Sequence, residues 1–334
     1  MKRHARRIHH CFIWRIAMYS VATVLLQTPP AMADGLIGAL VQRFAQSDFE
    51  FVRGQSNAPF PPAASLTTSV YQESEFRRPD DADSDVTFQQ AAVSQYALLP
   101  IPIGRRDAIA IGEWVSWTHF DIDNSPRNDL EVLSVGLPVG WVRQASPGWQ
   151  VAAFVAPVGH RTPEDSWYWE TLGGAFARNL RGDRFAWVVG VYFDVSPLED
   201  FYTPYLGATY LINERWTLNA IMPWPSVTYA PTTSTVFRLG VTPSGASWSV
   251  EPGERHPRMN LSTWNFGLTV ERRIARNLWL GFEAGVAGLR GLSIVGGDWE
   301  APETKLHNTG FARLTLNLRP GSSRADDAGP PASF

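Results

Sequence analysis

The amino-acid sequence predicts an all-β fold, a transmembrane antiparallel up-and-down β-barrel of about 12–14 strands. Three observations predict it. The chain opens with an export leader, apolar residues then alternate with polar or small ones over most of its length, and short connections alternate with longer ones. Alternation at period two is the pattern of a strand that has one face in apolar surroundings.

Residues 1–33 have the features of a signal peptide. They hold Lys2, Arg3, Arg6, Arg7 and Arg15 and no acidic residue. The apolar run that follows, residues 16–26, is too short to cross a bilayer as a helix, which takes about 20 residues. Ala31, Met32 and Ala33 then fit a cleavage site. We expect this segment to be removed on export; a membrane anchor is the alternative.

The charge and the cysteine content exclude several functions. Without the five basic residues of the leader, 24 Lys and Arg stand against 32 Asp and Glu, a net charge of −8. This charge argues against a nucleic-acid partner. The single cysteine, Cys11, lies in the leader, so the exported chain is predicted to have no disulfide and no thiol chemistry. We predict neither a metal site nor a cofactor.

The exported chain divides into three predicted parts. Residues 34–64 are an N-terminal periplasmic segment or a plug folded inside the barrel, because they lack the strand period and end in the linker NAPFPPAAS. Residues 65–318 are the barrel. Residues 319–334 are a polar C-terminal tail that ends in Phe334.

The strand period is clear in several segments. In WNFGLTVERR, which starts at Trp264, the residues Trp264, Phe266, Leu268 and Val270 share one face, and polar or small residues share the other. Residues 185–195, 237–242 and 311–318 repeat the pattern. About fourteen such segments are predicted, starting near residues 65, 86, 108, 130, 149, 167, 184, 202, 215, 234, 246, 260, 277 and 309.

The connections between these segments differ in length. Short ones are expected near residues 105–106, 146–148, 181–183, 213–215, 244–245 and 275–277. Longer, mostly acidic ones lie between them, except at residues 232–233, where a short connection falls on the side expected to be long. Short turns at one end and longer loops at the other are typical of outer-membrane barrels. A soluble β-sandwich or propeller would share the alternation and is the alternative.

Residues 204–229, PYLGATYLINERWTLNAIMPWPSVTY, are predicted to form a hairpin that turns at Asn213, Glu214 and Arg215. Leu206, Ala208, Tyr210 and Ile212 would face acyl chains, whereas Gly207 and Thr209 would face the lumen. Aromatic residues near strand ends are expected at the lipid–water boundary, namely Trp167, Trp169, Trp216, Trp224, Trp248 and Trp279.

On residues 204–231 and on the later turn IARNLWLGFEAG, the sequence resembles a family of exported bacterial outer-membrane β-barrels of unknown function. The resemblance covers most of the chain after residue 65. It implies a barrel in the outer membrane of a Gram-negative envelope, inserted by the barrel assembly machinery, and it implies no reaction. Barrels of this type often end on an aromatic residue in the last strand, whereas here the last strand ends at Leu318.

Candidate chemistry is sparse. His119 with Asp121, Asp123 and Ser125 is the nearest approach to a nucleophile, base and orienting group, as a lipid hydrolase or acyltransferase would need. A polar loop end explains the same residues.

Two sets of loop residues could hold cations. Asp80, Asp81, Asp83 and Asp85 could share divalent cations with lipopolysaccharide phosphates, although the spacing is not that of a calcium loop. His160, His256 and His307 are placed in outer loops, where we expect them to be solvated and not to meet around a metal.

Charges on the predicted inward faces are the candidate site, because charges inside a barrel either pair into a plug or line a water path. These lumen-lining candidates are Asp194, Arg238, Glu271, Arg273, Glu283 and Arg313. Small inward residues, including Gly207, Gly240, Gly267, Gly281 and Gly285, favour free interior volume. The sequence therefore predicts a non-enzymatic channel or small-solute-binding barrel; a lipid-modifying enzyme and a structural barrel with a closed lumen are the alternatives.

Overall fold

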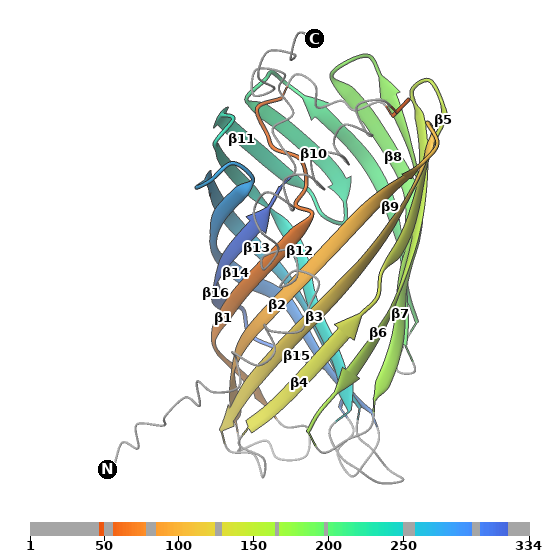
Figure 1. The fold of residues 1–334 in the computed structure, drawn as a ribbon. Helices are drawn as coiled ribbons and strands as arrows, with labels where there is room; N and C mark the ends of the chain where they lie inside the picture. The colour runs from red at the N-terminus through yellow and green to blue at the C-terminus, as the bar shows by residue number, and fades with distance from the viewer. Residues whose placement is uncertain are drawn as a thin grey trace.

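The protein is an antiparallel β-barrel (Figure 1). The computed structural model describes residues 47–49, 56–77, 85–123, 129–163, 167–196, 200–249, 258–295 and 301–319. Its strands are β1 (Ala64–Arg77), β2 (Asp85–Ile103), β3 (Asp107–Asp123), β4 (Asp129–Gly136), β5 (Val139–Ser146), β6 (Trp149–Arg161), β7 (Tyr168–Arg181), β8 (Phe185–Val195), β9 (Asp200–Leu211), β10 (Trp216–Met222), β11 (Ser226–Thr232), β12 (Thr235–Ser249), β13 (Arg258–Arg273), β14 (Leu278–Val295), β15 (Ala301–Lys305) and β16 (Thr309–Leu318). Among these residues there is no helix with the length and hydropathy needed to cross a bilayer.

The sixteen strands occupy fourteen positions around the barrel. β4 and β5 both pair with β3 and with β6, so they form one interrupted position, and β15 and β16 both pair with β14 and form another. β1 pairs with β16 from Ala64 opposite Leu318 to Tyr71 opposite Phe311, which closes the sheet. The predicted all-β barrel of about 12–14 strands is confirmed.

Several predicted strand boundaries were wrong. The turn expected at Ser244 and Gly245 does not exist, because β12 runs through both residues in register with β13. The strands that begin at Val139, Ser226 and Ala301 were not predicted. Pro138 interrupts the fourth position, where it cannot donate a ladder hydrogen bond. Residues 223–225 form the missed connection before β11.

The missed connection also explains the anomaly at residues 232–233. Residues 233–234 lie at the end of the barrel with the short turns, as their length requires. We call this the turn end (top in Figure 1) and the opposite end the loop end. The real exception is the connection at residues 223–225, which belongs to the loop-end series and joins two strands of only seven residues, β10 and β11.

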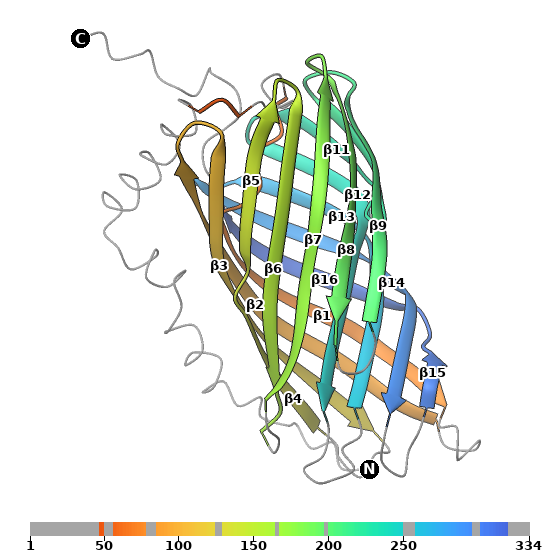
Figure 2. The same ribbon diagram turned by 90° about the vertical axis from the view of Figure 1, so that its right-hand side faces the viewer.

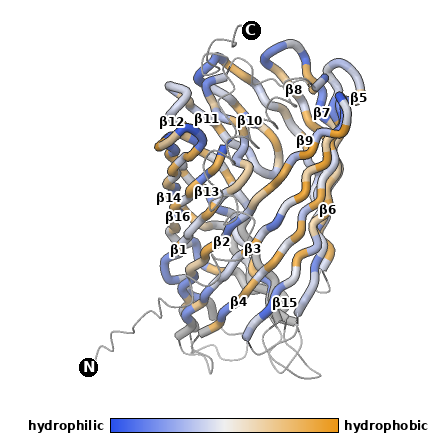
Figure 3. The backbone as a smooth tube through the Cα atoms, viewed as in Figure 1, coloured by the Kyte–Doolittle hydropathy of each residue, from blue (hydrophilic) through white to orange (hydrophobic). Residues whose placement is uncertain are grey.

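The outward faces carry the apolar residues, and the alternation is visible along most strands in Figure 3. Leu206 is 59% exposed, and Tyr210 and Ile212 are also exposed, as predicted. On the inner face of the same hairpin, the Thr209 hydroxyl donates to Asn219 Oδ1 at 3.0 Å. A closed sheet with an apolar outer belt satisfies its backbone internally and meets hydrocarbon outside, which is the architecture of an outer-membrane protein.

The segment before β1 lies against the turn end. Asn57 N donates to the Glu214 carbonyl oxygen at 2.7 Å in the β9–β10 turn, and Asn57 Nδ2 donates to the Ala230 carbonyl oxygen at 3.2 Å in β11. Ala63 N then donates to the Leu318 carbonyl oxygen at the β1–β16 seam. Residues 56–63 therefore pass along the inner rim from β10 to β1.

Residues 47–49 contact a different part of the rim. Asp48 N donates to the Arg105 carbonyl oxygen at 2.8 Å, and its carboxylate accepts hydrogen bonds from Arg105 Nε at 3.0 Å and Arg106 Nε at 3.2 Å in the β2–β3 turn. These two guanidinium groups lower the pKa of the Asp48 carboxyl from its ordinary value. Residues 1–33, 34–46 and 320–334 lie outside the described residues, so the signal peptide and the tail stay predictions.

Candidate functional site: the barrel lumen

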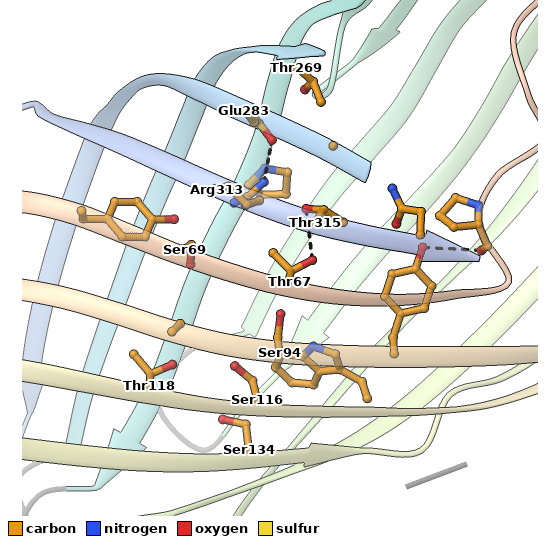
Figure 4. Close-up of a pocket in the computed structure, with 18 of the residues that line it drawn as sticks. Thr67, Ser69, Ser94, Ser116, Thr118, Ser134, Thr269, Glu283, Arg313 and Thr315 are labelled. Carbon is orange, nitrogen blue, oxygen red and sulfur yellow. Dashed lines mark hydrogen bonds and ion pairs between the residues drawn. The ribbon is translucent and has the colours of Figure 1, made fainter. Parts of the chain in front are cut away.

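One side of the lumen encloses a polar cavity of about 590 Å³ (Figure 4). Its walls are β1 to β4 with His160 of β6 on one side, and β12, β13, β14 and β16 on the other. Small hydroxyl side chains from neighbouring strands face it, among them Ser69, Ser94, Ser116, Thr118 and Ser134. These residues point inward because each occupies the alternate position to an outward apolar residue on its strand.

A charge pair lies on one wall of the cavity. Arg313 Nη1 of β16 donates to Glu283 Oε2 of β14 at 3.0 Å, and both side chains are mostly buried. The two residues are direct partners in the β14–β16 register. Beside them, Thr67 donates to Thr315 Oγ1 at 3.4 Å across the β1–β16 seam. The wall thus presents both signs of charge and several hydroxyls to one space.

A second charge group lies nearer the turn end. Arg319 Nη2 lies 2.6 Å from Glu271 Oε2, and Asn317 Nδ2 donates to the same oxygen at 3.3 Å. Arg319 Nη1 also donates to the Phe60 carbonyl oxygen at 2.6 Å. Arg319 therefore ties the segment before β1 to the inner wall of β13.

Two inward glycines make room for the carboxylates. A Cβ on Gly267 would lie 2.6 Å from Glu283 Oε1, and one on Gly281 would lie 3.1 Å from Glu271 Cγ. The side chains of Glu283 and Glu271 therefore lie flat over glycines of the adjacent strand. The predicted small positions leave volume in the lumen, and part of that volume is taken by charged groups.

The structure brings together four of the six lumen candidates. Glu271, Glu283 and Arg313 line the cavity, and so does Arg238. Among the described residues Arg238 has no ion-pair partner. That these charges act on a passing solute stays a prediction.

The other two candidates lie elsewhere. Asp194 faces inward near the loop end of β8, and its Oδ1 atom is buried without a hydrogen-bond partner in the described part of the chain. Arg273 is the partly exposed last residue of β13 at the turn end, and its backbone N donates to the Ser234 carbonyl oxygen. Neither residue lines the cavity.

A buried hydrogen-bond chain joins the polar side of the lumen to the next strands. Ser134 Oγ of β4 lies 2.8 Å from His160 Nδ1 of β6, and His160 Nε2 lies 2.9 Å from Glu170 Oε1 of β7. Placing His160 in an outer loop was wrong, because β6 extends to Arg161. Since a carboxylate only accepts, Nε2 carries a proton; with a neutral imidazole Nδ1 then accepts from the Ser134 hydroxyl.

This chain has the residue types of a nucleophilic triad, but in the described part of the protein no backbone donor beside it is free to bind an oxyanion. β4 pairs with β3 and with β6, so the backbone N–H groups beside Ser134 are used by the sheet. An acyl-transfer site needs free donors aimed at the developing oxyanion. The chain is better explained as a satisfied polar contact between three strands.

The opposite side of the lumen is aromatic. Phe154 of β6, Phe176 of β7, Tyr192 of β8 and Tyr205 of β9 face inward on consecutive strands, and Trp224 of the β10–β11 connection joins them. Ring centroids lie 6.0 Å apart for Phe154 and Phe176, 4.8 Å for Phe176 and Tyr205, 5.4 Å for Tyr205 and Trp224, and 5.8 Å for Tyr192 and Trp224. All five side chains are partly exposed. We call them the aromatic wall.

The aromatic wall corrects two predicted positions. Trp224 contacts the inward Tyr192 and Tyr205 and not the lipid boundary. Trp279 faces inward and is 2% exposed, packed with Ala230 and Val236. Trp167, Trp169 and Trp216 are exposed as expected. The side chain of Trp248 lies outside the described residues.

The remaining chemical candidates do not assemble into a site. His119 faces outward, stacks on Trp117 at 5.8 Å and has its Nδ1 3.9 Å from Glu131 Oε1. His307 is exposed, with its Nδ1 3.3 Å from the Glu75 carbonyl oxygen. Within the described ranges no three His, Cys, Asp or Glu side chains are placed to hold a metal. Ser125, His256 and the aspartates at 80, 81 and 83 lie outside those ranges, as does the side chain of Asp85.

No protein-family model and no curated protein sequence matches the chain. Solved structures with a similar course of the chain are bacterial membrane barrels. An outer membrane channel from Pseudomonas putida F1 has a TM-score of 0.43 and 10% identity, covering 80% of this chain and 100% of that one. The Ralstonia pickettii toluene transporter TbuX has a TM-score of 0.41 and 9% identity, and the match covers 78% of this chain and 90% of that one. The translocator domain of the autotransporter NalP from Neisseria meningitidis has a TM-score of 0.32 and 9% identity, and the match covers 91% of this chain and 99% of that one.

Proposed function

We propose that this chain is a non-enzymatic outer-membrane barrel that passes or binds a small solute in its lumen. The observation that supports the proposal most is the polar cavity of about 590 Å³ inside a closed sheet. A cavity of that size suits a small molecule, since ligand pockets usually measure about 300–1,000 Å³.

The strand number agrees with an interior that is partly free. Barrels of about eight strands are filled by side chains, whereas about 16–18 strands leave an open aqueous channel. Fourteen positions lie between these limits. Gly267 and Gly281 let the side chains of Glu283 and Glu271 lie flat along the wall, which keeps these side chains out of the centre of the lumen.

The turn end is assigned to the periplasm, because short turns face that side in outer-membrane barrels. Residues 34–64 then form a partial plug at the periplasmic mouth. The bonds from Asn57 to Glu214 and from Arg319 to Phe60 support this part of the proposal. Residues 1–33 are the signal peptide that sends the chain to a Gram-negative envelope.

The partners follow from the outer surface. The exposed apolar belt contacts outer-membrane lipid, and the loop end meets lipopolysaccharide. Insertion by the barrel assembly machinery and membership of the family of barrels of unknown function rest on sequence resemblance and stay predictions.

Conductance tests the proposal directly. The purified protein should migrate faster on a gel when unheated than when boiled, and it should give conductance steps in a planar bilayer. Replacing Arg319 with Ala removes the contacts to Glu271 and Phe60, so the steps should grow or open more often. Arg272→Ala, on the exposed face of β13, is the matched control and should change neither. A folded protein without conductance and without solute uptake into liposomes would refute the proposal.

A further inference from the structure

Between β9 and β12 the barrel wall stops short of the loop end, because β10 and β11 are short strands. β10 ends at Met222, opposite Leu206 of β9, and β11 begins at Ser226, opposite Gly240 of β12. β9 continues for residues 200–205 and β12 for residues 241–249 beyond these pairs. Figure 1 shows β10 ending partway along the wall, while Figure 2 shows the longer strands β6 to β8 on the adjacent side.

The continuing stretches are paired on one edge only. Residues 200–205 pair with β8, and residues 241–249 pair with β13. Within the described part of the chain, one hydrogen bond, from Val241 N to the Pro225 carbonyl oxygen, reaches the other edge. We call the space bounded by residues 200–205, 223–225 and 241–249 the notch.

The notch reaches into the apolar belt. Tyr202 faces outward, is 63% exposed, and lies four residues closer to the loop end than Leu206, the last partner of β10. Four residues of tilted strand rise about 10 Å. On the other flank Phe266, opposite Val241, is also exposed. The outer surface is therefore still apolar at a height where β10 and β11 have ended.

The free strand edges beside the notch need polar partners. An unpaired backbone group in hydrocarbon costs several kcal/mol, and irregular backbone at membrane depth is tolerated where it lines a water-filled cavity. The free edges of β9 and β12 meet this condition when the notch is continuous with the lumen. The wall would then be open sideways toward the lipid.

The aromatic wall ends at the base of this notch. Trp224 is part of the connection at residues 223–225, and its ring contacts Tyr205 and Tyr192. From there the rings continue through Phe176 to Phe154. Aromatic contacts contribute about 0.5–1.5 kcal/mol beyond burial, so a partly exposed row of rings holds a small aromatic solute better than the charged cavity opposite does.

We propose that small apolar aromatic molecules enter the lumen, move along the aromatic wall and leave sideways through the notch into the outer leaflet. This route rests on the proposed passage function and adds the solute class and the exit. Polar solutes and ions remain with the charged cavity, so the two routes are separable.

The test fills the notch. The β10–β11 hairpin is lengthened by four residues in each strand, apolar outward and polar inward, so that it pairs with residues 200–205 and 241–249. The probe is N-phenylnaphthylamine, an aromatic amine that fluoresces on reaching lipid, added to cells with a lipopolysaccharide outer membrane. The lengthened variant should reduce probe entry to that of cells without the protein and leave ion conductance unchanged.

A matched control adds the same residues to the β7–β8 turn, at the opposite end of the barrel from the notch, and should leave probe entry unchanged. If the lengthened variant does not fold, as judged by its gel shift, Trp224→Ala decides. Loss of about one stacking contact should slow entry roughly two- to tenfold. Trp169→Ala, on the exposed outer face, should have no effect.

Two results would overturn the inference. One is a folded, lengthened protein that still admits the probe at the original rate. The other is an unaltered protein that conducts ions but admits no probe above background. Absence of ion conductance would instead count against the proposed function, so the two failures are distinguishable.

Discussion

The two sides of the lumen differ in chemistry although the same alternation builds both. Inward positions on β1 to β4, β12 to β14 and β16 carry hydroxyls and the charges of Glu283 and Arg313. Inward positions on β6 to β9 carry the rings of the aromatic wall. Period two decides which face a residue occupies but not what that face does. One barrel can therefore offer two surfaces to two kinds of solute.

The largest effect is expected from removing His160, which links β4 and β7 where the two sides of the lumen meet. His160→Ala leaves the Ser134 hydroxyl and the Glu170 carboxylate buried without their partner. We expect a loss of about 2–4 kcal/mol in the free energy of unfolding. Urea titration in detergent measures it. His119→Ala, on the outer face, should cost far less, and equal losses would contradict this account.

A smaller effect is expected on the aromatic side. Phe176→Ala removes a ring that contacts both Phe154 and Tyr205. Because the ring is partly exposed, we expect the free energy of unfolding to fall by about 1–3 kcal/mol, which is less than for a ring in a closed core. Ion conductance should persist, since the charged cavity is untouched. Phe282→Ala, on the outward face, is the control for general loss of an aromatic side chain. A change of ion conductance in Phe176→Ala but not in Phe282→Ala would contradict the separation of the aromatic side from the polar side.

The charge pair on the polar side tests whether ions pass along that wall. Arg313→Ala leaves Glu283 without its cation, at an expected cost of about 1–2 kcal/mol for a pair that is partly solvated. The cavity also becomes more negative, so the reversal potential in a salt gradient should shift toward cation selectivity. Arg313→Lys should restore most of the original selectivity. An unchanged reversal potential in Arg313→Ala would show that ions do not pass this wall.

The smallest effect concerns the rim contact of Asp48. A carboxyl whose pKa is lowered by folding contributes its contact above its unfolded value and loses it as the pH falls through the folded value. The hydrogen bonds to Arg105 and Arg106 should therefore weaken below the ordinary value of 3.8. Channel recordings on acidification should show more openings in that range. Asp48→Asn should show such openings already at neutral pH; identical recordings for both proteins would exclude a role for this contact.

Alternation predicted the strands, and the export leader together with the short and long connections predicted that they form a membrane barrel. Alternation failed at residues 223–225, where prolines take the place of the usual glycine or asparagine of a turn, and at Pro138, which divides a strand position without ending it. The predicted count of strands was right partly because a turn that does not exist at residues 244–245 offset a missed one.

The site was less predictable than the fold. Inward charges could be identified one by one, but the pairing of Glu283 with Arg313 depends on the β14–β16 register, which periodicity does not fix. The chain from Ser134 to Glu170 joins strands β4, β6 and β7 in the same way. A polar residue at an inward position was the available signal for Ser134 and Glu170. Trp224 gave none, because loop aromatics are ordinarily placed at the lipid boundary.

The seam between β1 and β16 makes assembly an all-or-none event. The first strand of the barrel finds its final neighbour only when the last ten residues of the sheet, Thr309–Leu318, have been delivered. Until then both ends of the sheet expose unsatisfied backbone, which a bilayer does not tolerate. A chain truncated before Thr309 should therefore fail to insert stably into the membrane, even with its other thirteen wall positions intact.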